Sequence, residues 1–308
     1  MIKQKNDYID LTIFDSLKDY DLLKSEIYSD ENNLPEFRFV IPTFPEKTLG
    51  CLVSEGGTGK SIFAMNTCAN YACGRNYLSN LDRQFSVKKN INVAYLSLED
   101  SDVVCAHRLN AILNSKINNF TDEEKEEIGK RFLLINNNTS IDLMSNDHNK
   151  SLSTINNLKK IASSVDLMFI DTFIRTHSAN ENDAGEMSGV MKVFENIIKE
   201  CDCSIIFLHH VNKEGGFRGS SAIRDNVRWL ASLSVASREE VNDTATNSDR
   251  CVVFKIEKSN NSMIPKPMLF YKEMYKTEKV KTVVLKDISD KYKEKEQMKT
   301  KRSVRKWK

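Results

Sequence analysis

The chain has 308 residues, of which 40% are hydrophobic and 29% charged, and its formal net charge is +2. This length and composition fit one large α/β domain with small appendages, and they exclude nucleic-acid binding through bulk positive charge alone. No apolar run is long enough to span a bilayer and no signal peptide opens the chain. The seven cysteines, an odd number, favour reduced thiols and a cytoplasmic location.

The two ends of the chain differ in charge from its middle. The first forty residues are acidic and predict one or two polar helices over residues 1–35, whereas the last eighteen, "KYKEKEQMKTKRSVRKWK", are strongly basic. We therefore divide the chain into an N-terminal extension (1–40), a central domain (41–285) and a basic tail (286–308). The tail is expected to be a solvated, frayed arm, with a nucleic-acid contact as the alternative.

Apolar strands alternate with helices in the central part of the chain. Strands are predicted at residues 49–55, 90–100, 165–173, 203–210, 229–237 and 250–259, and helices at 60–74, ending at Gly74, and at 184–202. Such an alternation predicts a mainly parallel central sheet with helices on both faces.

Polar groups gather where these strands end. Glu99 and Asp100, then Asp171, then His209 and His210 each follow an apolar strand. Because ligands of parallel sheets bind at the carboxyl ends of the strands, these residues are expected to share one edge. The loop after the strand at residues 49–55 leaves from the same edge.

That loop, "SEGGTGKS" at residues 54–61, is close to the phosphate-binding pattern G-x-x-x-x-G-K-[ST], with Ser54 in place of the first glycine. The alternative, a glycine turn without a ligand, fits less well because a strand precedes the loop and a helix follows it. We expect ATP to bind through the loop, which comprises Gly56, Gly57, Thr58, Gly59, Lys60 and Ser61.

Three further sets of residues at this sheet edge could act on a bound ATP. Asp171 would hold Mg²⁺ together with Ser61, unless it is only a polar strand end. Glu99 is the candidate general base for water, and the alternative is that it caps the next helix. His210 or His209 would sense the γ-phosphate or be structural. A metal site that uses Cys201, Cys203 and the histidines is disfavoured because no further ligand pair completes it.

Five segments, in this order, are "SEGGTGKS", "VAYLSLED", "LMFIDTFIRTHSANENDAG", "CSIIFLHHVNK" and "FRGSSAIRDNVRWLASLS". Together they resemble the RepA-type hexameric replicative helicases of plasmids, within the RecA/DnaB-like ATPase superfamily. The resemblance covers about residues 48–260 and leaves both ends of the chain uncovered. It implies a RecA-like P-loop NTPase fold.

The resemblance also implies roles for single residues. Lys60 and Ser61 match the Walker A residues, Asp171 the Walker B aspartate and Glu99 the catalytic glutamate. His210 matches the residue that couples the γ-phosphate to the DNA-facing loop. Arg228 matches an arginine finger donated to the neighbouring subunit, and Lys258 matches a second cation that acts there. Arg108 lies in a matching stretch but receives no role.

A finger that acts in trans implies a ring, expected to be hexameric, around single-stranded DNA. Lys213 and Arg218 are the candidate phosphate contacts in the loop after the strand at 203–210, and either could equally be solvated surface. A primase or an initiator protein is a further expected partner, with the basic tail as one place for it. No membrane partner is expected.

Three other functions compete with the helicase. A ParA-like partition ATPase is disfavoured because its signature lysine would stand where this chain has Glu55. A small-molecule kinase would need an acceptor pocket and lid arginines that are not found in the sequence. A RecA-like, DNA-associated ATPase that regulates or loads a replication or recombination partner without unwinding stays open.

Overall fold

The computed structural model describes residues 37–78, 87–136, 141–144, 148–211, 221–242 and 245–293. The chain divides into two units, Met1–Phe37 and Arg38–Lys308, and every helix and strand described below belongs to the second. The predicted extension at residues 1–40 and the tail at 286–308 lie largely outside the described residues. No helix in the described ranges is long and apolar enough to cross a membrane.

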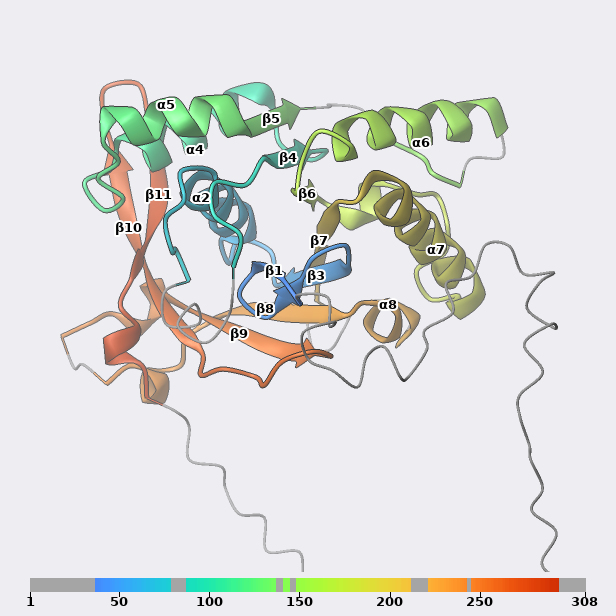
Figure 1. The fold of residues 1–308 in the computed structure, drawn as a ribbon. Coiled ribbons are helices and arrows are strands. Elements are labelled where there is room, and N and C mark those ends of the chain that lie inside the picture. Colours follow the sequence, from blue (N-terminus) through green and yellow to red (C-terminus); the bar gives the residue numbers. More distant parts are fainter. Residues whose placement is uncertain are drawn as a thin grey trace, which may run out of the picture. The chain divides into compact units, whose positions relative to one another are not determined.

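A nine-stranded sheet forms the centre of the second unit (Figure 1). Its strands, in chain order, are β3 (Leu49–Ser54), β4 (Val93–Ser97), β5 (Phe132–Asn136), β6 (Leu167–Asp171), β7 (Ser204–His210), β8 (Trp229–Val235), β9 (Cys251–Ser259), β10 (Met268–Lys276) and β11 (Lys281–Asp287). Their order in space is β11-β10-β9-β8-β3-β7-β6-β4-β5. A short hairpin, β1 (Phe39–Ile41) with β2 (Phe44–Pro45), precedes them.

The strands from β8 to β5 in this order pair parallel, whereas β9, β10 and β11 extend the sheet by antiparallel pairing. The expectation of a mainly parallel α/β sheet is thus confirmed. Strands β5, β10 and β11 are not among the strands predicted from the sequence. The predicted domain end at residue 285 falls inside β11.

Helices cover both faces of the sheet, as expected. They are α2 (Lys60–Ala72), α4 (Asp102–Asn114), α5 (Asp122–Arg131), α6 (His148–Ala162), α7 (Ala184–Cys201) and α8 (Ser221–Asn226). Two separate apolar clusters show how they are divided. One contains buried residues of α2, α4 and α5, and the other contains those of α6, α7 and α8.

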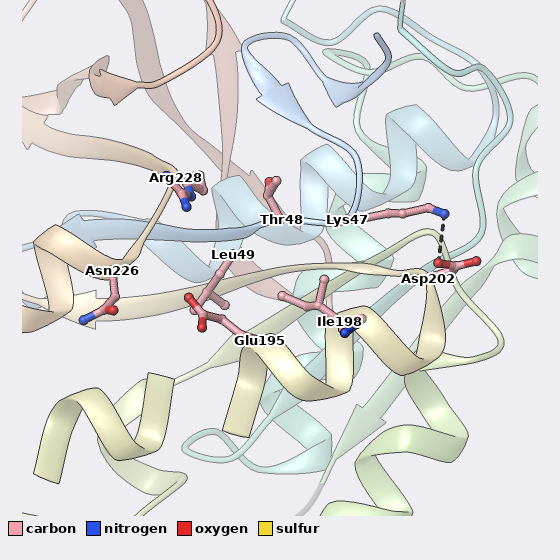
Figure 2. A pocket seen from close by; sticks show the side chains of 9 residues that line it. Lys47, Thr48, Leu49, Glu195, Ile198, Asp202, Asn226 and Arg228 are labelled. Carbon is pink, nitrogen blue, oxygen red and sulfur yellow. Dashed lines mark ion pairs between the residues drawn. The ribbon is translucent and has the colours of Figure 1, made fainter. Parts of the chain in front are cut away.

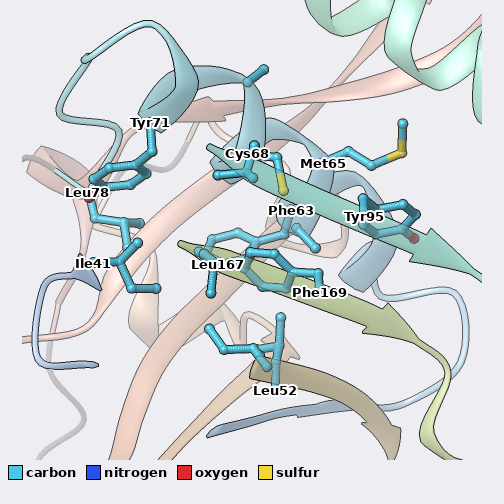
Figure 3. Close-up of a cluster of buried hydrophobic side chains, with 14 of the residues drawn as sticks. Ile41, Leu52, Phe63, Met65, Cys68, Tyr71, Leu78, Tyr95, Leu167 and Phe169 are labelled. Atoms are coloured by element: carbon cyan, nitrogen blue, oxygen red, sulfur yellow. The ribbon is translucent and has the colours of Figure 1, made fainter. Parts of the chain in front are cut away.

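Strand periodicity assigns each residue to one of these faces. In β4, Val93 and Tyr95 join the α2 cluster, whereas Ala94 and Leu96 join the α7 cluster. Figure 3 shows part of the α2 cluster, in which Phe63 of α2 is drawn with Leu167 and Phe169 of β6. Because both faces are covered, both sets of strand residues must be apolar, which explains the continuous apolar runs in the sequence.

Local signals fix the helix ends. Gly74, with φ of +78°, follows α2, and its backbone N–H donates to the carbonyl of Tyr71. A glycine in this left-handed conformation commonly stops a helix. The Ser101 hydroxyl caps α4 by accepting from the Val104 N–H, and Thr121 forms a capping box with Glu124 at the start of α5.

Candidate active site

The loop between β3 and α2 carries two glycines in conformations that other residues rarely adopt. Gly57 has φ of +74° and Gly59 has φ of +114°. Ser54, which replaces the first glycine of the motif, is the buried last residue of β3, and its hydroxyl donates to the carbonyl of Glu55 at 2.9 Å. Because Ser54 is an extended strand residue, this position needs no glycine here.

A cavity of about 390 Å³ opens beside this loop. Loop, sheet and hairpin residues line it together: Gly56, Gly57, Gly59, Lys60, Ser61, Ile62, Glu99, Asp100, Arg108, Asp171, His210, Thr282 and Val283. The structure therefore brings together most of the residues that the sequence placed at one sheet edge. Their catalytic and binding roles stay predictions.

Lys60, the first residue of α2, is buried beside this cavity. Burial lowers the pKa of Lys60 below its usual 10.5, and the nearby carboxylates of Asp171 and Glu99 oppose this effect in part. A buried cation next to glycine-loop amides is arranged to receive an anion, because a phosphate group would compensate the charge that the protein only partly balances.

Asp171 meets two hydroxyl groups at the end of β6. The Ser61 hydroxyl lies 2.5 Å from Oδ2 of Asp171, and the Tyr95 hydroxyl donates to the same oxygen. Strand alternation explains the meeting, because Leu167, Phe169 and Asp171 all face α2. Oxygen ligands of this kind suit Mg²⁺, so the Ser61–Asp171 pair fits the ion that a nucleotide would bring.

Strand alternation also separates the two histidines of β7. Along this strand Ile206 and Leu208 face α2, and so does His210, which lines the cavity. His209 is buried on the opposite face, where its ring stands edge-on to Phe173 at 5.5 Å between centroids. Of the two candidates, His210 is therefore the one that reaches the cavity.

Glu99 lies close to His210 at the mouth of the cavity. Its Oε2 is 4.0 Å from Nε2 of His210, and the Glu99 side chain is 48% exposed. Ser101 supplies the cap of α4, so Glu99 is not used for capping. An exposed carboxylate beside the cavity has access to water, as a general base requires.

An ion pair that the sequence analysis did not assign lies next to Glu99. Arg108 of α4 makes two hydrogen bonds to the carboxylate of Asp100, and both residues line the cavity. The Asn136 amide fixes the same segment by donating to the carbonyl of Asp100 at 2.6 Å. The pair places a guanidinium beside the candidate phosphate site.

Arg228 and Lys258 lie at the other end of β3. The N–H of Arg228 donates to the carbonyl of Leu49, and Trp229 pairs with Gly50, whereas the P-loop begins after Ser54. A strand of six residues spans about 20 Å. Within one chain, therefore, Arg228 is remote from the cavity that holds Lys60.

This second region has a cavity of its own, of about 310 Å³. It is lined by Lys47, Thr48, Leu49, Glu195, Ile198, Lys199, Asp202, Asn226 and Arg228 (Figure 2). The Arg228 side chain is exposed. Lys258 donates to the carbonyls of Arg224 and Asp225 at 3.1 and 3.2 Å, and burial lowers its pKa. Two cations thus share this edge.

The DNA contacts and the metal site are the remaining predictions on site residues. Lys213 and Arg218 lie outside the described residues, so their proposed DNA contacts stay predictions. Among the described residues, Cys201, Cys203, His209 and His210 form no group that could hold a metal ion. All seven cysteines carry free thiols.

Comparison with known proteins assigns the family. The sequence matches the AAA domain family AAA_25 over residues 18–216. The chain belongs to this family. The AAA_25 match includes the glycine loop, Glu99, Asp171 and His210, and it ends before Arg228 and Lys258. With its mixed, mostly parallel sheet flanked by helices, the fold is RecA-like, and the chain is a P-loop NTPase domain.

Two solved structures resemble this AAA_25 chain at 16% sequence identity and a TM-score of 0.45. The flagellar accessory protein FlaH from Methanocaldococcus jannaschii matches over 80% of this chain and 90% of its own. The RadB recombinase matches over 74% of this chain and 88% of its own. Neither similarity carries an argument about function.

Proposed function

We propose that this protein is an ATP-dependent replicative DNA helicase of the plasmid RepA type. In this proposal it forms a ring, hydrolyses ATP at subunit interfaces and translocates on single-stranded DNA. One observation carries the proposal: the candidate phosphate site and the cations Arg228 and Lys258 lie at opposite ends of β3.

This polarity favours an assembly in which the edge of one subunit that carries Arg228 faces the cavity of the next. An interface between two different surfaces is heterologous, and it closes into a ring when its rotation allows. In such an interface Arg228 and Lys258 would stabilise the charge that develops on the transferred phosphoryl group, a contribution of about 10³–10⁵ in rate.

The residues of the cavity would supply the other parts of hydrolysis. Lys60 and the loop amides would bind the β- and γ-phosphates, and Ser61 with Asp171 would hold Mg²⁺, which neutralises phosphate charge. Glu99 would orient the attacking water and accept its proton. His210, 4.0 Å from Glu99, is placed to respond to the same phosphate.

Steady-state ATP hydrolysis with and without single-stranded DNA tests this function, with wild type beside Arg228→Ala. We expect DNA to stimulate the wild type strongly and Arg228→Ala to lose hydrolysis while it still binds nucleotide. Arg131→Ala is the control, because this arginine pairs with Glu127 on α5 and lines neither cavity.

Hydrolysis that responds neither to DNA nor to loss of Arg228 would overturn the helicase proposal and leave the P-loop assignment intact. If DNA does stimulate hydrolysis, a strand-displacement assay distinguishes the helicase from the DNA-associated ATPase. Unwinding supports the helicase, whereas DNA-stimulated hydrolysis without unwinding supports the DNA-associated ATPase that regulates or loads a partner.

A further inference from the structure

The antiparallel hairpin β10–β11 reaches the glycine loop within the same chain. The Lys272 ammonium, in the middle of β10, donates to the carbonyl oxygen of Gly57 at 3.2 Å. The Lys272 side chain also passes close to Gly59, where a Cβ atom would lie 3.8 Å from Cε of Lys272. From the partner strand β11, Thr282 and Val283 line the cavity itself.

The contact acts on the part of the loop that would hold phosphate. The carbonyl of Gly57 and the N–H of Thr58 belong to one planar peptide unit, so fixing one group orients the other. Lys272 binds the carbonyl, and a long 3.4 Å hydrogen bond joins the N–H to the carbonyl of Glu55. Gly57 is itself exposed and has a positive φ, whereas Thr58, the next residue of the same peptide unit, is buried. The Lys272 contact therefore adds to the restraint on this peptide unit.

The charge of Lys272 has no acidic counterpart in the described part of the chain. Burial alone lowers its pKa, and no carboxylate there forms an ion pair with it. Lys276, four residues further along the same strand, is exposed and makes no hydrogen bond to the described residues of the loop, whereas Lys272 is half-buried and bonded to Gly57. The difference between these two lysines indicates a specific role for Lys272 at the loop.

We propose that Lys272 is a positioning residue for nucleotide binding, which holds the Gly57–Thr58 peptide of the P-loop from the C-terminal hairpin. This inference rests on the nucleotide site of the proposed function but needs neither DNA nor a ring. Because Lys272 acts through the loop that would hold the phosphates and not through the γ-phosphate, ADP and ATP should depend on it equally.

The test is direct titration of fluorescent ADP and ATP analogues into the wild-type full chain, Lys272→Met, Lys272→Arg and Lys276→Met. Loss of a charge-assisted hydrogen bond that is partly exposed should weaken binding of both nucleotides about fivefold in Lys272→Met. Lys272→Arg should retain most of the affinity, and Lys276→Met should match wild type. Apo melting curves verify that each variant is folded.

Two results would overturn the inference: wild-type affinity in Lys272→Met, or weaker binding of ATP with unchanged binding of ADP. If Lys272→Met does not fold, Lys272→Ala, which removes both the donor and the charge, takes its place in the same comparison. Lys60→Ala distinguishes failure of the Lys272 inference from failure of the proposed function. Nucleotide binding lost in Lys60→Ala but unchanged in Lys272→Met rejects only the inference, whereas a wild type that binds no nucleotide rejects both.

Discussion

Ser61 and Tyr95 donate hydrogen bonds to the same oxygen, Oδ2 of Asp171, from two different elements of the fold. Ser61 belongs to the P-loop helix α2 and Tyr95 to the adjacent face of β4, and Tyr95 is fully buried. The carboxylate is therefore oriented before any ion arrives. Ser61 can exchange its hydrogen bond for Mg²⁺, whereas Tyr95 can keep its own.

Tyr95→Phe should consequently weaken Mg²⁺ binding without removing a ligand. Loss of an outer hydrogen bond to a ligating carboxylate typically costs about 10–100-fold in metal affinity. The measurement is nucleotide binding as a function of Mg²⁺ concentration, with Tyr275→Phe as the control, because Tyr275 is a half-buried residue of β10 that does not line the cavity. An unchanged Mg²⁺ dependence in Tyr95→Phe would refute the orienting role.

Lys60→Met should stabilise the protein in the absence of nucleotide, although it removes the proposed phosphate contact. Burial lowers the pKa of Lys60, so the folded state disfavours the charge that the unfolded chain carries freely. A gain of ~1 kcal/mol would raise the melting temperature by roughly 2–4 °C in a domain of this size. Lys276→Met, a surface change, should leave it unchanged.

The lowered pKa of Lys60 also predicts whether the free energy of unfolding rises or falls with pH. Between the lowered pKa of folded Lys60 and its usual 10.5, the unfolded chain binds more protons. The free energy of unfolding of the wild type therefore rises with pH through that interval, and this contribution is missing in Lys60→Met. Melting curves at a series of alkaline pH values check it, and parallel profiles for both proteins would contradict it.

His177 should make the protein less stable in mild acid. It is buried, with its ring 4.7 Å from that of Phe173, and burial lowers its pKa below 6.5. As the pH falls below 6.5, the unfolded chain takes up a proton that folded His177 does not, so stability falls by up to about 1.4 kcal/mol per pH unit. Urea unfolding at pH 7.5 and 5.5 measures this.

His177→Gln should show a smaller loss of stability between the two pH values than wild type. His107→Gln, on α4, serves as the control for a histidine outside this buried position. An equal loss in wild type and His177→Gln would assign the acid sensitivity to other groups.

A shared active site predicts recovery when two inactive proteins are mixed. Lys60→Ala subunits retain Arg228, and Arg228→Ala subunits retain Lys60. At equal mixing, half of the cavities keep Lys60 and half of their neighbours keep Arg228, so about a quarter of the wild-type rate should return in a heterologous assembly. Absence of recovery, with both variants folded and assembled, would count against a site between subunits.

The sequence predicted the parallel part of the fold because both of its faces are buried. The strands β3, β4, β6 and β7 are uninterrupted apolar runs, and each ends at the residues that line the cavity. By contrast, β10 and β11, the two outermost strands on one side of the sheet, carry short apolar runs interrupted by charged residues, and β5 is only partly buried. Their patterns gave no comparable signal.

Contacts between distant segments account for what was missed at the candidate site. Tyr95 lies within an apolar strand and is marked only by a hydroxyl whose partner is 76 residues away. Lys272 is one lysine among many, and it meets Gly57 across 215 residues. Only strand register could separate His210 from His209, which a pattern of residue types leaves equivalent.

Every residue of β3 is buried, and the strand is paired along its length with β7 on one side and β8 on the other. An inner strand that is hydrogen-bonded on both sides is rigid along its length, so a displacement of one end would also displace the other. In the proposed ring, movement of the glycine loop at one end would be passed along β3 to Leu49, whose carbonyl accepts from the N–H of Arg228 at the other end. Each subunit would thereby link the events at its two neighbours mechanically, with no flexible relay between them.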